Sequence, residues 1–355
     1  MDSPLWKASQ STKTALWNDS ADPKELAASI TFGAVGATCN PVIALTAIKA
    51  NLAQWQPKLA AIAQANPNAT ESQIGWKAVE LLSIDAAKLL EPIFRARGGR
   101  DGRLSIQTDP RLIRDVDALV EQAVYFSQLA PNIIVKIPAI KNGIVAIEEA
   151  TFRGVSINVT VSFTVSQALA AAQAIERGLD RRAAAGLEMR EFGSVVTIMG
   201  GRLDDWLKYC ANRDRVLIDP GYLEWAGVAT LKKAHHLFVE RGYRSRILSA
   251  AFRNYMQWSE LVGGDLVVSP PFDWQLRINE NSLPVENRID TPVDPNIIET
   301  LRARLPEFRL AYDVDGLAID EFDSFGPTRR TLRQFLEANA ELDALVRDVL
   351  VPQAN

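Results

Sequence analysis

The chain has 355 residues, of which 47% are hydrophobic and 23% are charged, an ordinary composition for a globular protein. Its 39 basic and 43 acidic residues give a net charge of −4, which argues against a dedicated nucleic-acid binder with a basic face. Only two cysteines and two adjacent histidines occur, so we expect neither a disulfide framework nor a metal site.

Short strand-like runs alternate with longer helical stretches along most of the chain. The runs lie at residues 15–18, 34–38, 103–108, 132–137, 155–161, 193–199, 246–249 and 265–269. Helices are predicted after each run, among them one from Asp109-Pro110 to about residue 129 and one at about 253–262. Such alternation predicts a parallel sheet, and eight units predict an α/β fold of the closed (β/α)8 TIM-barrel type.

The last part of the chain breaks this pattern. It is rich in proline and charge until about residue 296, and helices are then predicted at 296–304 and 326–350. We therefore assign residues 1–272 to a barrel domain and residues 273–355 to a helical C-terminal extension packed on the barrel. No apolar run could span a membrane, and no signal-peptide pattern opens the chain, so we expect a cytoplasmic protein.

Polar residues at the ends of the predicted strands are the candidates for a site, because barrel enzymes work at the carboxyl ends of their strands. Lys136 stands out, because the strand around it is otherwise apolar. Burial lowers the pKa of a lysine, and a neutral amine can attack a carbonyl to form a Schiff base. A structural ion pair is the alternative role for this lysine.

Two arginines follow neighbouring strands. Arg202 comes after two glycines at a predicted helix start, and Arg253 lies near the start of the next such helix. Helix amino ends with arginines predict a phosphate site. The neighbouring pair Asp204-Asp205 has no metal-like partners in the sequence and is expected to lie on a helix surface.

Several segments together resemble the transaldolase family, including its smaller fructose-6-phosphate aldolase members. The most specific are Asn132–Pro138 with its lysine and Gly154–Thr160 with its Asn-x-Thr ending. The other matching segments, in family order, are Leu16–Ser20, Gly36–Pro41, Gly201–Asp204 and Ser249–Asn254.

The resemblance implies a Schiff-base mechanism without metal or cofactor. It implies that Lys136 attacks the ketone, that Asp19 acts as acid–base, and that Thr160 helps to hold a water. Gln107 completes the catalytic set. The implied substrate-binding residues are Asn40, Asn158, Arg202 and Arg253, and Thr38 and Thr197 are added as candidates because they lie at the ends of predicted strands. The implied partners are sugar phosphates, and a homodimer is a further expectation, while no nucleic acid or membrane partner is expected.

The sequence leaves the reaction open between related classes. The length and the tail favour a transferase that moves a dihydroxyacetone unit between sugar phosphates. Gln107 stands where transaldolases usually have Glu and the smaller aldolases have Gln, which favours a lyase that cleaves or forms a ketose phosphate. Met199, and Ala251 in place of a serine, leave the substrate open. A specialised relative acting on an unusual sugar, or a non-catalytic binder, is the remaining alternative.

Overall fold

Eight parallel strands close into a barrel in sequence order, which confirms the predicted fold class. The computed structural model describes residues 3–352. The strands are β1 (Ala15–Asn18), β2 (Ala34–Thr38), β3 (Arg103–Gln107), β4 (Ile133–Pro138), β5 (Ile157–Thr160), β6 (Val195–Ile198), β7 (Arg246–Ala250) and β8 (Val267–Ser269). Each strand lies where a strand-like run was predicted, although the structure shortens several runs at one or both ends.

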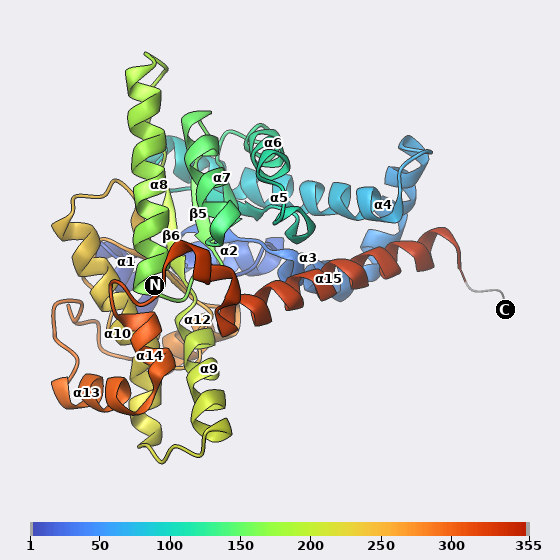
Figure 1. Cartoon of the computed structure of the whole chain (residues 1–355). Helices are drawn as coiled ribbons and strands as arrows, with labels where there is room; N and C mark the ends of the chain where they lie inside the picture. The colour runs from blue at the N-terminus through green and yellow to red at the C-terminus, as the bar shows by residue number, and fades with distance from the viewer. Residues whose placement is uncertain (1–2, 353–355) are drawn as a thin grey trace.

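Helices surround the barrel (Figure 1). Those up to the end of the barrel are α1 (Pro4–Ser11), α2 (Pro23–Thr31), α3 (Pro41–Ala50), α4 (Leu52–Ala65), α5 (Glu71–Ala96), α6 (Val116–Ser127), α7 (Lys141–Phe152), α8 (Val165–Ala184), α9 (Gly200–Arg213), α10 (Pro220–Glu240), α11 (Met256–Ser259) and α12 (Phe272–Glu280). The later ones are α13 (Pro295–Arg304), α14 (Pro306–Tyr312) and α15 (Gly326–Leu350), and 3-10 turns occupy Pro110–Leu112 and Ile319–Ser324.

Local sequence explains where several helices begin. Asp22 and Asn40 accept hydrogen bonds from the first free amides of α2 and α3, and a proline occupies the first turn of each. Thr70 and Gln73 form a reciprocal capping box at the start of α5. The caps of α2 and α3 fix the chain direction just after β1 and β2, where the candidate residues lie.

The inside of the barrel is filled by side chains that are separate from the main core between barrel and helices. Trp17 is the largest member of this inner cluster and is fully buried. A Cβ atom on Gly36 would lie 2.4 Å from the Trp17 indole, so the close approach of β1 and β2 requires glycine there. The strands therefore enclose a packed core rather than a pore.

Two local predictions need correction. The helix expected from Asp109-Pro110 is a 3-10 turn followed by α6, because Asp109 and Asp115 each cap a separate element. The helix expected at 253–262 is only α11, since the Gln257 side chain accepts a hydrogen bond from the Arg253 amide at 2.6 Å. After the last strand, helix α12 begins at Phe272 within the stretch described as rich in proline and charge, and it packs against α1 and α2.

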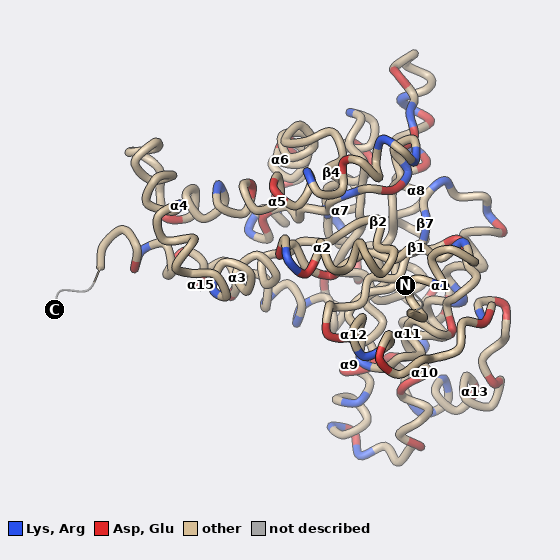
Figure 2. The backbone as a smooth tube through the Cα atoms, turned by 180° about the vertical axis from the view of Figure 1, so that it is seen from behind, with Lys and Arg blue, Asp and Glu red and all other residues tan. Residues whose placement is uncertain are grey.

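The C-terminal helices lie against the barrel helices (Figure 1). Helix α15 packs along α3, α4 and α5 and also contacts α9, while α13 and α14 pack on α10. Figure 2 shows Lys and Arg interspersed with Asp and Glu along the outer helices. Within residues 3–352, no helix is both long and apolar enough to cross a bilayer.

Candidate active site at the carboxyl ends of the strands

Lys136 lies inside the barrel on β4 with 5% of its surface exposed. Its neighbours in register are Gln107 on β3 and Asn158 on β5. No carboxylate of the described residues lies within ion-pair distance of its ammonium, so the structural ion pair considered from the sequence is absent there. An unpaired buried ammonium costs folding free energy, and groups kept at such a cost are often functional.

Burial lowers the pKa of Lys136 below its ordinary value, because the charged form loses solvation. The positive charge of Arg202 acts in the same direction, whereas Asp19 opposes both. A larger fraction of the neutral amine is therefore present at a given pH than for a lysine in water. The neutral amine is the form that can attack a carbonyl carbon.

Gln107 ends β3 beside this lysine and is 3% exposed. Its side-chain oxygen is buried and has no hydrogen-bond partner among the described residues. Buried acceptors are rarely left unpaired in folded proteins, because each one costs about 1–3 kcal/mol. The amide is therefore available to a hydroxyl group or a water that enters the site.

Both the nitrogen and the oxygen of the Asn158 side-chain amide form hydrogen bonds. Its nitrogen donates to Ser105 Oγ at 3.0 Å, and its oxygen accepts from Thr197 Oγ1 at 2.7 Å. Ser105 and Thr197 lie on β3 and β6, so the bonds cross the interior of the barrel. Thr197, expected to bind substrate, is placed as a residue that orients Asn158, and Ser105 is a member of this set that sequence reasoning missed.

Asp19 follows β1 and is partly exposed, and its Oδ1 accepts a hydrogen bond from Thr38 Oγ1 at 2.5 Å. Thr38 ends β2 and is buried. The electrostatic influence of Asp19 on Lys136 places the two groups at the same end of the barrel. The charge of Asp19 therefore acts on Lys136 without an ion pair between them, and Thr38 holds the carboxylate.

Asn40 caps a helix at this end of the barrel. Its Oδ1 caps α3 by accepting from the Ile43 amide at 3.0 Å, while its Nδ2 has no partner among the described residues. The preceding Cys39 is buried, and burial raises the pKa of its thiol to about 12. Cys39 is thus a neutral thiol in the wall of the site, and Asn40 retains one free donor for a ligand.

Thr160 ends β5 and is 1% exposed. Its backbone oxygen accepts from the Ala139 amide at 2.7 Å, whereas its hydroxyl forms no hydrogen bond with the described part of the chain. A free hydroxyl next to the Lys136 strand is suited to hold a water. The placement agrees with the role that the resemblance implies, which stays a prediction.

Arg202 and Arg253 lie close together because the start of α9 touches the end of β7. A Cβ atom on Gly201 would lie 1.9 Å from the Ala251 carbonyl oxygen, and Ala251 has a φ of 62°. The close contact therefore requires glycine at position 201. Burial lowers the pKa of Arg202, and the nearby charge of Arg253 lowers it further.

Helix α15 contributes hydrogen-bond acceptors to Arg202. Arg202 Nη1 donates to Gln334 Oε1 at 2.6 Å and to Thr331 Oγ1 at 3.3 Å. A cavity of about 490 Å³ lies here, lined by Arg202, Asp205, Trp206, Arg253, Pro327, Arg330, Thr331, Arg333, Gln334 and Glu337. Sequence reasoning missed the contribution of α15, since nothing in its amphipathic pattern tells which turn faces Arg202.

The expectation that Asp204 and Asp205 both lie on a helix surface is wrong for Asp204. Asp204 is fully buried, accepts from the Gly227 amide at 2.7 Å and from Gln257 Nε2 at 2.7 Å. Burial raises the pKa of Asp204 well above its ordinary value. Asp205 is half-buried and accepts from Arg253 Nε at 2.8 Å. Asp204 thus supports the helix start from inside, whereas Asp205 lies at the surface, as predicted, and pairs with Arg253.

No group of three or more His, Cys, Asp or Glu side chains among residues 3–352 is arranged to hold a metal ion. The chemistry available at this end of the barrel is that of a desolvated amine, a carboxylate, amides, hydroxyls and two arginines. Such a set can form an imine, move a proton and bind an oxyanion.

Comparison with known proteins gives a family match over residues 16–311, described as Transaldolase/Fructose-6-phosphate aldolase. Transaldolase 1 of Streptomyces avermitilis is 36% identical over 172 residues, 48% of this chain and 45% of that protein. The transaldolase of Thiobacillus denitrificans is 29% identical over 263 residues, 66% of this chain and 70% of that protein. The transaldolase of Acidothermus cellulolyticus is 26% identical over 328 residues, 88% of this chain and 86% of that protein. The chain spans slightly less than half the length of the Streptomyces relative.

Proposed function

The chain belongs to the Transaldolase/Fructose-6-phosphate aldolase family, and we propose that it is a transaldolase-type transferase that moves a dihydroxyacetone unit between sugar phosphates. The observation that carries this proposal is Lys136, a buried amine without an ion-pair partner, flanked by an unpaired amide and a fixed asparagine. Curated relatives from three bacteria bear the name transaldolase.

The first step joins the donor ketose to the enzyme. The lone pair of neutral Lys136 attacks the ketone carbon, a proton moves to the carbonyl oxygen, and loss of water gives an iminium ion. A water held by the free hydroxyl of Thr160 and the amide of Gln107 carries these protons. Both groups are buried next to the lysine strand, so the transfers occur away from bulk solvent.

The second step breaks a carbon–carbon bond. Asp19 accepts the proton of the hydroxyl group beyond the bond, an aldehyde leaves, and the bonding electrons pass to the iminium as an enamine on Lys136. The enamine then adds to an acceptor aldehyde while Asp19 returns the proton, and hydrolysis frees the lysine. Thr38 fixes the carboxylate for this exchange through its 2.5 Å hydrogen bond.

The phosphate group of either sugar is held by Arg202 and Arg253, which adjoin a cavity of about 490 Å³. Gln334 accepts from Arg202 in the structure, and a phosphate oxygen can take its place as a stronger, charged acceptor. Asn40 and Asn158 orient the three-carbon unit, the former through its free Nδ2. Thr197 contributes indirectly by fixing Asn158.

A lyase reaction is the second candidate, and Gln107 favours it. A glutamine can donate and accept hydrogen bonds but cannot carry a proton at this position. In a lyase reaction Asp19 returns its proton to the enamine carbon instead of to an acceptor, and hydrolysis of the resulting iminium releases dihydroxyacetone. A specialised relative acting on an unusual sugar uses the same lysine chemistry and differs only in the ligand of the arginine cavity.

Borohydride trapping in the presence of fructose 6-phosphate tests the proposal. Reduction of the imine is expected to add one dihydroxyacetone-sized unit to Lys136, detected by intact mass and peptide mapping, with none on Lys136→Ala. Lys232→Ala is the matched control, because that lysine is also buried but forms an ion pair with Glu260 at 2.9 Å. No adduct with this ketose or with a panel of ketose phosphates and sulfonates would leave a non-catalytic binder.

An acceptor requirement separates the two candidate reactions. A transferase consumes the donor ketose at a sustained rate only when an aldose phosphate is present, whereas a lyase releases free dihydroxyacetone from the ketose alone. Measuring dihydroxyacetone with and without the acceptor decides between them, provided that the lysine adduct has first been observed.

The remaining expectations are kept as proposals. We propose a cytoplasmic location because both cysteines are buried and unpaired, as is usual in a reducing compartment. We also propose a homodimer, which sedimentation analysis would test. Residues 273–355 are proposed to be part of the barrel domain's fold rather than an independent domain, since α15 packs along α3 and α5.

A further inference from the structure

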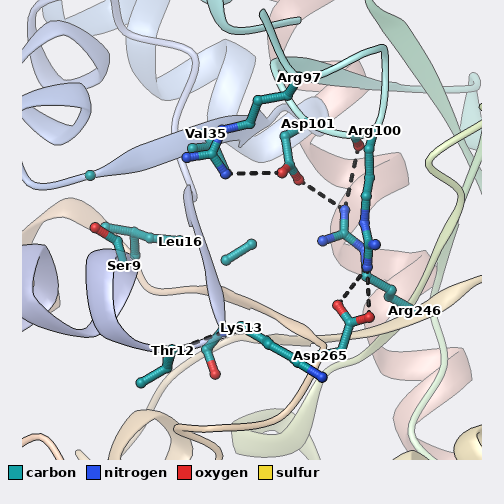
Figure 3. A pocket seen from close by; sticks show the side chains of 13 residues that line it. Ser9, Thr12, Lys13, Leu16, Val35, Arg97, Arg100, Asp101, Arg246 and Asp265 are labelled. Atoms are coloured by element: carbon teal, nitrogen blue, oxygen red, sulfur yellow. Dashed lines mark hydrogen bonds and ion pairs between the residues drawn. The ribbon is translucent and has the colours of Figure 1, made fainter.

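A second cavity lies at the opposite end of the barrel from Lys136 (Figure 3). It measures about 410 Å³ and is lined by Ser9, Thr12, Lys13, Thr14, Ala15, Leu16, Gly33, Val35, Arg97, Arg100, Asp101, Arg246 and Asp265. Ala15 and Arg246 are the first residues of β1 and β7, so the cavity opens at the amino ends of the strands. The proposed reaction uses none of these residues.

The wall of this cavity carries more positive than negative charge. Four cationic side chains face two carboxylates, Asp101 and Asp265. Asp265 is bound at 2.5 and 2.7 Å by one guanidinium nitrogen of Arg100. Asp101 accepts from Arg97 at 3.2 Å and from Arg246 at 3.0 Å. Lys13 has no partner among the described residues, so the cavity keeps uncompensated positive charge in a chain with a net charge of −4.

A further positive charge, that of Arg103, is buried behind the residues that line the cavity. Arg103 is 1% exposed and donates only to uncharged oxygens, those of Gly99, Ser156 and the Glu191 backbone. Burial lowers its pKa to about 9, and the nearby Arg246 lowers it as well. Arg103 therefore stays charged at neutral pH without a carboxylate bound to it, because the buried Asp101 is bound by Arg97 and Arg246 and Glu191 nearby is exposed.

Free donors point into the same space. Arg246 is 8% exposed, and only its Nη2 has partners, which leaves Nε and Nη1 unpaired within the described chain. Figure 3 shows Arg97 at the top of the cavity, Arg100 and Arg246 at its right, and Lys13 along the bottom, where its side chain runs toward Asp265. Donors from three separate segments suit the tetrahedral oxygens of a phosphate better than a planar carboxylate, which a single guanidinium fork can satisfy.

From this arrangement we propose that the cavity at the amino ends of the strands binds a phosphate group, either inorganic phosphate or that of a small phosphorylated metabolite. The bound dianion compensates the charge of Lys13, Arg97 and Arg246. The site is separate from the arginine pair at the carboxyl ends, and it does not depend on the function proposed above.

Titration calorimetry with inorganic phosphate at low ionic strength tests this site in an Arg202→Gln background, which weakens phosphate binding at the other end. One phosphate per chain is expected. The double substitution Lys13→Glu with Arg97→Glu, both of exposed side chains, is expected to weaken binding at least about tenfold. Arg304→Glu, at an exposed arginine outside the cavity, is the matched charge-reversal control and is expected to change nothing.

A change of opposite sign sharpens the test. Asp265→Asn removes an exposed carboxylate and frees Arg100, so phosphate binding is expected to strengthen severalfold while the fold is kept. Repeating the titration with glycerol 3-phosphate and with citrate separates a phosphoester site from a free-phosphate site and from a carboxylate site. Absence of binding, binding unchanged by the Lys13 and Arg97 substitutions, or preference for citrate would overturn the proposal.

Discussion

The two ends of the barrel differ in whether their buried charged side chains are paired. At the carboxyl ends of the strands, Lys136 is buried without an ion pair and Gln107 keeps an unpaired oxygen. At the amino ends, Asp101 and Arg246 are buried together and joined at 3.0 Å. The first arrangement reduces stability and leaves groups free to react, whereas the second uses its charges to hold strands together.

This contrast predicts that removing Lys136 abolishes activity without unfolding the protein. Lys136→Met is expected to lower kcat/KM by more than about a thousandfold, because the covalent nucleophile is gone. The same change is expected to raise the free energy of unfolding by about 1–2 kcal/mol, since an unpaired buried ammonium is replaced by an apolar chain of similar size. Steady-state kinetics and denaturant unfolding measure the two effects.

Lys232 supplies the matched control for that substitution. It is also buried, but it donates to Glu260 at 2.9 Å and to two backbone oxygens. Lys232→Met is expected to cost about 3 kcal/mol of stability, because the buried Glu260 loses its buried partner and keeps only the half-exposed Arg288 at 2.8 Å. Equal stability changes at the two lysines would contradict the distinction between a paired and an unpaired ammonium.

At the amino ends, the buried pair is expected to matter for stability and not for the proposed reaction. Asp101→Asn leaves the buried Arg246 without its carboxylate partner, and we expect a loss of about 3 kcal/mol in the free energy of unfolding. Asp265→Asn removes the exposed partner of Arg100, where both side chains are 44% exposed, and should cost less than about 1 kcal/mol. Urea unfolding measures both losses. Similar losses at the two aspartates would contradict the claim that a buried ion pair contributes more to stability than an exposed one.

Thr197 tests whether the carboxyl-end amides need their supports. Thr197→Val removes the hydroxyl that binds Asn158 at 2.7 Å, and a misplaced amide is expected to lower kcat/KM by about ten- to a hundredfold. Thr230→Val is the control, because Thr230 is equally buried but bonds to the Ala226 carbonyl on α10. Loss of activity in both variants would point to a general effect of the substitution.

The smallest expected effect is a shift of the pH dependence. The rate of imine trapping should rise with pH around a midpoint below 10.5, the ordinary pKa of a lysine. Asp19→Asn should move this midpoint lower and Arg202→Gln should move it higher, because their charges act oppositely on Lys136. A midpoint that stays fixed in both variants would exclude this electrostatic coupling.

The lowered pKa of Lys136 also makes the free energy of unfolding depend on pH. Its folded pKa is lowered, so between that value and 10.5 the unfolded chain holds more protons than the folded one. The free energy of unfolding contributed by this group therefore rises with pH across that window. The difference between Lys136→Met and the parent should shrink as the pH approaches 10.5.

The strand order and the chemistry of the lysine strand could be predicted from the sequence. Runs such as Ala34–Thr38 and Asn132–Ile137 are short, apolar and separated by capped helical stretches, and these are local properties. Lys136 was conspicuous because a charged residue breaks an apolar run. The sequence could not predict that Lys136 has no ion pair, because that depends on every side chain around it in the barrel.

Only the tertiary structure decided which distant groups meet. Gln334 reaches Arg202 across 132 residues of sequence, and Asp204 is buried because α9 packs on α10. The cluster of Arg97, Arg100 and Arg246 forms where turns before β3 and β7 converge at one end of the barrel. Local periodicity fixes the type and order of the elements, whereas contacts between remote side chains depend on how those elements close and pack.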